Sequence, residues 1–101
     1  MIALRIIENP GQLYRMPKGE AGIQPGDMWR DPVWDTPERE CWAIVLPNGT
    51  VFRTTETAGG SGQMWDVTGE PPDVTISPSI DDRDPQHPWH GFIRNGVLDP
   101  S

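Results

Sequence analysis

The chain has 101 residues, enough for one small domain with a thin hydrophobic core. Its net charge of −7, with only eight lysines and arginines, argues against nucleic-acid binding through phosphate contacts and against an anionic membrane surface. One cysteine excludes an intramolecular disulfide, and 11 glycines and 12 prolines predict many turns. Five tryptophans argue against disorder, so a compact, loop-rich domain is expected.

The N-terminal half offers few regular elements. Residues 2–7 are rich in isoleucine and predict a β-strand, and the segment is too short and too interrupted for a signal peptide. Residues 12–24 have weak periodicity, and no secondary structure is predicted for them. Pro25-Gly26 predicts a turn before an apolar anchor. Thr36 followed by Pro37 could begin one helical turn over residues 36–40.

The clearest local pattern is a β-hairpin in the middle of the chain. Residues 41–46 are apolar and residues 50–55 are mostly β-branched, and Asn48-Gly49 between them supplies the positive φ angles of a tight turn. Cys41 opens the first strand and is expected to be a buried structural thiol. Residues 58–62 are glycine-rich and predict a flexible loop.

The C-terminal part predicts further short strands. Residues 64–68 and 73–77 form two of them, and Pro78 is expected to end the second because proline has no N–H to donate. Residues 90–93 and 97–98 predict a hairpin around Asn95-Gly96. The chain is therefore expected to form a single all-β domain over residues 1–101, mainly antiparallel, with six or seven short strands. A small loop-rich sheet or a partly open barrel fits this, with little or no helix.

Ser79 and His90 are the candidates for chemistry. Ser79 follows a proline that restricts the backbone, and His90 has an ordinary pKa near ~6.5 that suits a general base. Together they would be the minimum for an activated serine nucleophile. Gly91 would leave open space beside the imidazole for a substrate. The alternatives are a serine that bonds a turn amide and a histidine that is packed or solvated.

Three neighbouring features stay open as alternatives. Ser77 is a second candidate hydroxyl on the same face as Ser79. His87 and His90 could suggest a metal site, but Pro88 disfavours helical pairing and paired metal-ligand spacings are absent, so no metal and no cofactor are expected. The acidic stretch over residues 81–84 predicts a solvated loop, although an aspartate there could orient His90.

Segments at residues 25–29, 42–49, 65–69, 78–80 and 90–96 follow one another in an order that resembles a small bacterial and actinobacteriophage family of unknown function. It includes the peptidase-like component of Bub-type ubiquitin-like conjugation operons. The resemblance covers roughly residues 25–98 and is strongest at Pro78-Ser79-Ile80 and at the stretch from His90 to Gly96. Weaker parts are the motifs around Trp29, Trp42 and Trp65. Several members have a cysteine shortly before the histidine, where this chain has residues 86–88.

The resemblance implies a serine hydrolase or peptidase acting on a protein or peptide, such as a ubiquitin-like protein. Ser79 would be the nucleophile and His90 the general base, whereas Ser77 carries over less well. Trp89, Arg94 and Asn95 flank the histidine and are candidate binding residues. The implied location is the bacterial cytoplasm, with no membrane or nucleic-acid partner, and short strand edges leave a homodimer open.

A non-catalytic function competes with the enzyme. The chain could be a phage-encoded protein-interaction module or a small structural phage protein. Trp29 and Trp34, in a charged and loop-rich region, would then be binding hot spots. An enzyme requires Ser79 and His90 within roughly 3–4 Å of each other, and a module requires an exposed tryptophan surface instead.

Overall fold

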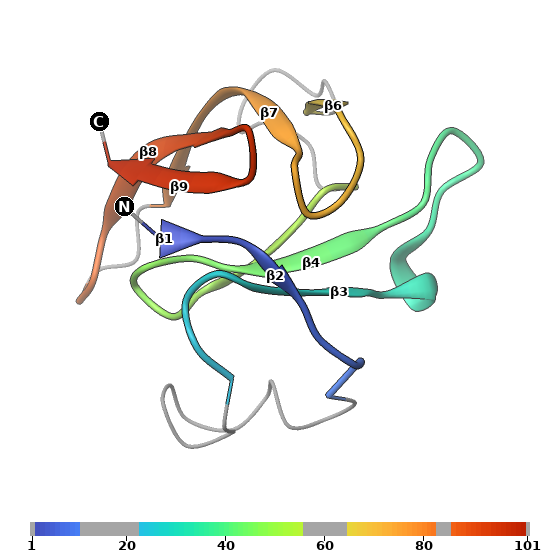
Figure 1. Ribbon diagram of the computed structural model, residues 1–101, viewed down its shortest axis with the longest axis horizontal. Helices are drawn as coiled ribbons and strands as arrows, with labels where there is room; N and C mark the ends of the chain where they lie inside the picture. The colour runs from blue at the N-terminus through green and yellow to red at the C-terminus, as the bar shows by residue number, and fades with distance from the viewer. Residues whose placement is uncertain (1, 11–22, 56–64, 83–85, 101) are drawn as a thin grey trace.

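Short strands make up two sheets (Figure 1). The computed structural model describes residues 2–10, 23–55, 65–82 and 86–100, and only the backbone of residues 78, 81 and 82. Its elements are β1 (Ile2–Ala3), β2 (Arg5–Ile6), β3 (Asp27–Arg30), the 3-10 turn η2 (Pro32–Trp34), β4 (Trp42–Val45), β5 (Val51–Arg53), β6 (Asp66–Thr68), β7 (Thr75–Asp82), β8 (Trp89–Arg94) and β9 (Val97–Pro100). The all-β, mainly antiparallel class is confirmed, and the sheets form no closed barrel.

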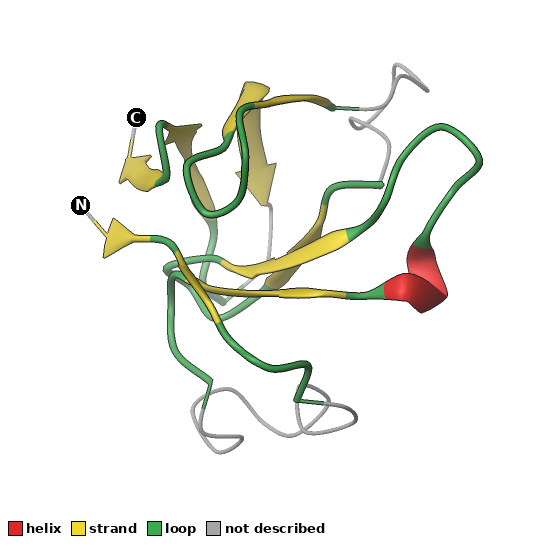
Figure 2. Cartoon of the chain, turned by 45° about the vertical axis from the view of Figure 1, so that its right-hand side comes forward, coloured by secondary structure: helices red, strands yellow, loops and turns green. Residues whose placement is uncertain are grey.

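The two sheets differ in size and share one core. The five-stranded sheet has the order β1-β9-β8-β7-β6, and the four-stranded sheet has the order β2-β3-β4-β5. Only β2 and β3 pair in parallel among the described strands. Figure 2 shows both sheets as strands and loops, with η2 as the one helical turn among the described residues. No helix in the described ranges is long and apolar enough to span a membrane.

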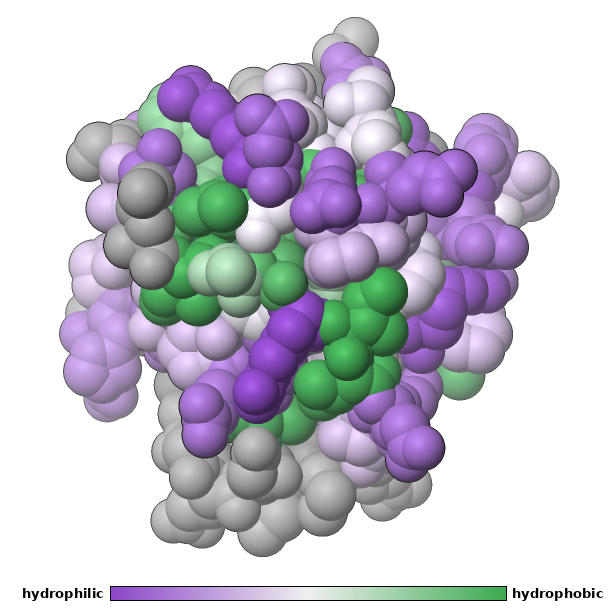
Figure 3. Space-filling model, viewed as in Figure 1, coloured by the Kyte–Doolittle hydropathy of each residue, from purple (hydrophilic) through white to green (hydrophobic). Residues whose placement is uncertain are grey.

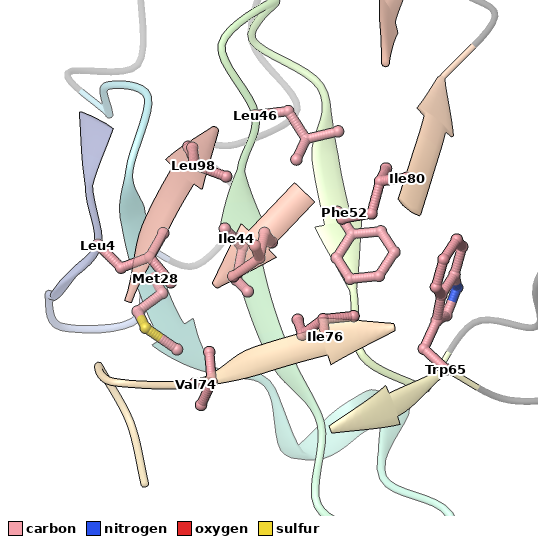
Figure 4. Packing of buried hydrophobic residues seen from close by; sticks show 11 residues of the cluster. Leu4, Met28, Ile44, Leu46, Phe52, Trp65, Val74, Ile76, Ile80 and Leu98 are labelled. Carbon is pink, nitrogen blue, oxygen red and sulfur yellow. The ribbon is translucent and has the colours of Figure 1, made fainter. Parts of the chain in front are cut away.

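The core lies between the sheets because each contributes one apolar face. Its buried side chains are Leu4, Met28, Ile44, Leu46, Phe52, Trp65, Val74, Ile76, Ile80, Ile93 and Leu98. Figure 4 shows that they converge from elements far apart in the sequence. Phe52 and Trp65 meet edge to face with ring centroids 5.4 Å apart, a favoured aromatic geometry. This burial is the main stabilising contribution to so small a fold.

The four-stranded sheet is also covered on its other face. Trp29, Ala43 and Val45 form a second buried cluster there, with Ile23 and Val51 packed against it. Burial on both faces explains why β4 belongs to a continuous apolar run rather than an alternating one. Trp29 is fully buried, so the prediction that it is a binding hot spot is wrong.

The N-terminal segment connects the sheets. The sequence predicted one strand over residues 2–7, but β1 joins the five-stranded sheet and β2 the four-stranded sheet. Leu4 lies between them, buried in the core, and its N–H donates to the carbonyl oxygen of Gly96 at 2.8 Å. The next N–H, of Arg5, donates to the carbonyl oxygen of Gly26 at 2.9 Å. One short segment is thereby hydrogen-bonded to both layers.

Both predicted hairpin turns are present. Asn95 and Gly96 have φ angles of +50° and +76°, as the two-residue turn between β8 and β9 requires. Between β4 and β5 only Gly49 is left-handed, with φ +88°, and the Asn48 side chain accepts a hydrogen bond from the Thr50 N–H at 3.1 Å. The second turn therefore uses a longer loop than a simple Asn-Gly turn.

Other local predictions need correction. A turn followed by an apolar anchor was predicted around residues 25–29, without a strand. β3 forms at residues 27–30 because β2 and β4 both pair with it. The helical turn lies at η2 instead of at residues 36–40, where Thr36 and Arg39 form a β-bridge. Pro78 does not end its strand, because β7 continues to Asp82. Residues 12–22 and the glycine-rich loop 58–62 lie outside the described residues.

The loop between β3 and β4 is held by charged groups. The Arg30 guanidinium donates to both oxygens of Asp35, at 2.7 and 3.1 Å, and to the carbonyl oxygen of Cys41 at 2.9 Å. The Cys41 N–H donates to Asp35 at 2.6 Å, and the Cys41 side chain is fully buried, as predicted. The hydrogen bonds from Arg30, the larger effect, and from the Cys41 N–H lower the pKa of Asp35 below its ordinary value of 3.8.

Replacing Asp35 should therefore change the acid sensitivity of the fold. The folded state holds this carboxyl at a lowered pKa, so its stabilisation is present above the ordinary value and is lost as the pH falls below 3.8. We expect Asp35→Asn to unfold at lower urea than wild type at neutral pH, with the difference shrinking in acid. Glu38→Gln, at an exposed position of the same loop, is the control. An equal difference at both pH values would contradict this assignment.

Candidate active site

The site begins with an irregular pairing between β7 and β8. Ile76 lies opposite Ile93, but the next aligned pair is Ile80 opposite Gly91. Residues 77–79 of β7 therefore face a single residue of β8, Phe92. Such a bulge redirects the side chains of the longer strand, and bulges are frequent near active sites. It also gives Pro78 a position where the missing N–H disrupts no regular ladder.

Ser79 and His90 meet at this bulge. The Ser79 Oγ lies 3.0 Å from the His90 Nε2, within hydrogen-bond distance. His90 is exposed and Ser79 is half-buried, so the pair is accessible to a macromolecule. For the serine to donate this bond, the imidazole proton must reside on Nδ1, which leaves Nε2 as the acceptor. This tautomer is the one that a general base requires.

Ser79, rather than Ser77, is the serine bonded to the histidine. Ser77 is exposed at the first position of the bulge, and its backbone pairs with Asp66 of the edge strand β6. Strand alternation could not separate the two hydroxyls, because Ser77 and Ser79 lie two residues apart and would share one face of the strand. The structure separates them, because the Oγ of Ser79 lies 3.0 Å from the His90 Nε2.

The prediction that Gly91 leaves space for a substrate is wrong. A Cβ built on Gly91 would lie 2.5 Å from the Asp99 carbonyl oxygen and 2.5 Å from the Trp89 Cζ2. The absent side chain makes room for the Trp89 indole, which is half-buried and packs against the core. Gly91 therefore lets Trp89 pack beneath the strand that carries His90.

Trp89 also borders a hollow at the start of β8. The hollow measures about 540 Å³ and is lined by Pro47, Asn48, Gln86, His87, Pro88 and Trp89. The Asn48 side chain donates to the carbonyl oxygen of His87 at 2.6 Å, so the β4–β5 turn is bonded to the segment that precedes His90. The binding role predicted for Trp89 stays a prediction, and the indole's place beside this hollow is compatible with it.

The remaining candidate binding residues lie at the other end of β8. The Asn95 N–H donates to the Thr75 Oγ at 3.0 Å, and its left-handed backbone serves the turn. The guanidinium of Arg94 lies over the ring of Phe92, with 3.9 Å from Cζ to the ring centroid. Phe92 was not among the predicted site residues, although alternation along a strand places it on the same face as His90 and Arg94.

The described residues bear on a metal site and on an orienting aspartate. Within these ranges no three His, Cys, Asp or Glu side chains are grouped so that they could hold a metal ion. In the acidic stretch, the backbone of Asp81 pairs in register with His90. Residues 83–85 and the side chains of Asp81 and Asp82 lie outside the described part. An orienting aspartate for His90 stays a prediction.

Apolar side chains reach the surface in a few places. Among large apolar residues, Val33 is 87% exposed, Trp34 50% and Ile6 49%. On the face shown in Figure 3, apolar side chains surface mainly near the middle, with polar side chains around them. Trp34 stacks on Arg53, whose Cζ lies 4.8 Å from the ring centroid. Of the two tryptophans considered as hot spots, only Trp34 is available for an interaction.

A serine hydroxyl bonded to an accessible imidazole is the core arrangement of a serine hydrolase. The chain belongs to the family described as bacterial ubiquitination-like system serine protease (BubE), which it matches over residues 48–100. The matched region runs from the β4–β5 turn to the end of β9 and includes both Ser79 and His90. The suspected family resemblance is thereby confirmed. No curated protein and no solved structure matches the chain.

Gly91→Ala should destabilise the protein. The added methyl group has no room between a backbone carbonyl oxygen and the indole of Trp89. Overpacking of this kind costs about 1–3 kcal/mol, and we expect urea unfolding followed by tryptophan fluorescence to show a loss in this range. Thr68→Ala, at an exposed position of the same sheet, is the control. Unchanged stability of Gly91→Ala would contradict the tight packing of Gly91 against both the Asp99 carbonyl oxygen and Trp89.

Proposed function

We propose that this protein is a serine peptidase that acts on a protein or peptide substrate, with Ser79 as nucleophile and His90 as general base. The observation that carries the proposal is the 3.0 Å contact between the Ser79 Oγ and the His90 Nε2. It lies within the distance at which a base can accept the proton of a hydroxyl. The family description, a serine protease, supports the same assignment.

The proposed reaction is acyl transfer followed by hydrolysis. His90 Nε2 accepts the Ser79 proton while Oγ bonds to the substrate carbonyl carbon. The resulting tetrahedral intermediate collapses as the bond to the leaving group breaks, and His90 returns the proton to that group. Water then attacks the acyl-enzyme, again with His90 as base, and restores the free serine. The oxyanion formed in each half-reaction requires hydrogen-bond donors, commonly backbone N–H groups.

A folded protein is the substrate class that best fits the site. The Ser79–His90 pair lies on a sheet face, where His90 is exposed, so a large partner can reach it. The family is described as part of a ubiquitination-like system, which suggests a ubiquitin-like protein or a conjugate of one. The scissile bond would then be an amide or ester formed at the end of that protein's chain.

The test is covalent labelling with a fluorophosphonate, which reacts with activated serines. We expect wild type to be labelled, Ser79→Ala to be unlabelled, and His90→Ala to react slower by roughly 10²-fold or more because its general base is gone. Ser77→Ala is the matched control, since this exposed serine has no hydrogen bond to His90 in the structure. It should label like wild type.

Failure would take one of two forms. A folded wild type that does not label would overturn the hydrolase assignment. Labelling that persists in Ser79→Ala, or that is lost in Ser77→Ala, would overturn the choice of nucleophile. Circular dichroism of each variant shows that loss of labelling is not loss of fold.

A second candidate function is a non-catalytic protein-interaction module. The observation that favours it is the exposed pair Val33 and Trp34. The Trp34 indole stacks on Arg53, and Arg53 is itself bonded to buried Asp31 at 3.2 Å. These contacts hold the Trp34 side chain in place. The two functions differ in which variant matters. Trp34→Ala should leave fluorophosphonate labelling intact if the protein is a peptidase, and a module should tolerate Ser79→Ala.

A further inference from the structure

Arg94 differs from the other arginines that the structure describes. The others each have an oxygen partner: Arg5 bonds Asp27, Arg30 bonds Asp35, Arg39 bonds the carbonyl of Trp65, and Arg53 bonds Asp31. Among these described arginines, Arg94 alone has no carboxylate or carbonyl partner, and its contact is with the face of Phe92. Its guanidinium N–H groups are therefore available to a ligand.

This cation lies beside the candidate active site. His90, Phe92 and Arg94 alternate along β8 and so share its outer face. The Phe92 ring centroid is 6.3 Å from that of His90 and 3.9 Å from the Arg94 Cζ, which places the guanidinium within about 10 Å of the imidazole. The aromatic ring connects the cation to the catalytic pair.

The stack on Phe92 prepares the guanidinium for binding. A free arginine side chain loses considerable rotamer entropy when a ligand fixes it. Contact with the ring face restricts Arg94 beforehand. The planar guanidinium carries N–H donors that match the two oxygens of a carboxylate in a bidentate pair.

We propose that Arg94, held on Phe92, is a specificity-determining residue that binds the carboxylate of an acidic side chain of the substrate. The proposal deepens the proposed function and rests on it. An extended peptide advances roughly 3.3 Å per residue, so a group within about 10 Å of His90 belongs to a residue two to four positions from the scissile bond. A net charge of −7 repels acidic substrates in general, so Arg94 would select one acidic residue at a defined position.

The test uses peptidyl fluorophosphonates, because they report recognition and serine reactivity in one rate. Each probe carries one glutamate, or glutamine at the same place, two to four residues from phosphorus on either side. For wild type we expect the best glutamate probe to react about tenfold or more faster than its glutamine partner, as hydrogen bonds to charged groups allow. The ratio should fall to about one in Arg94→Gln and be intermediate in Arg94→Lys, which offers a point charge without the planar fork.

Controls distinguish the possible failures. Arg53→Gln removes an arginine of the other sheet and should keep the wild-type ratio. Arg94→Glu should prefer a probe with lysine at the same position. If wild type reacts equally with glutamate and glutamine at every position, or if Arg94→Gln keeps the preference, the inference is overturned while the proposed function stands. If neither these probes nor a simple fluorophosphonate labels wild type, the proposed function itself fails.

Discussion

The pairing of β7 with β8 is the constraint on which the rest of the site depends. Ile76 and Ile80 are both buried on the inner face, opposite Ile93 and Gly91. A slip of one residue would turn these isoleucines toward solvent, so the core fixes the register on both sides of the bulge. Residues 77–79 lie between these two fixed pairs, opposite Phe92 alone, so they cannot follow the regular pairing. Ser79 lies in this irregular segment, with its Oγ 3.0 Å from the His90 Nε2.

The parts of the fold that the sequence predicted are those with local causes. Asn95-Gly96 determines its turn through backbone angles alone, and the apolar run around Ile44 marks its strand without reference to a partner. The parts that were missed have non-local causes. β3 begins at Asp27, a poor strand former, and exists because strands on both sides pair with it. The continuation of β7 past Pro78 requires a bulge, whose position depends on the opposite strand.

The site likewise has features that the sequence predicted locally and features that depend on distant contacts. The residue types of Ser79 and His90 were evident from the sequence, and the family resemblance chose Ser79 over Ser77, but neither gives a distance. The close contact between Trp89 and Gly91 was misjudged because a glycine beside a histidine suggests open space, and only the packed indole shows that the space is filled. Phe92 could have been found, because alternation from His90 to Arg94 passes through it.

The buried Cys41 gives the protein a chemical reporter of its own opening. It is the only cysteine of the chain, and its side chain is fully shielded from solvent immediately before β4. A thiol reagent can react only with molecules in which that strand has transiently separated from its surroundings, so the alkylation rate measures a local opening equilibrium. Ser79, half-buried beside exposed His90, can be reached without such an opening. The rate of reaction with a thiol reagent would thus report local opening around Cys41. The rate of reaction with a serine reagent, measured on the same sample, would report the Ser79 site separately.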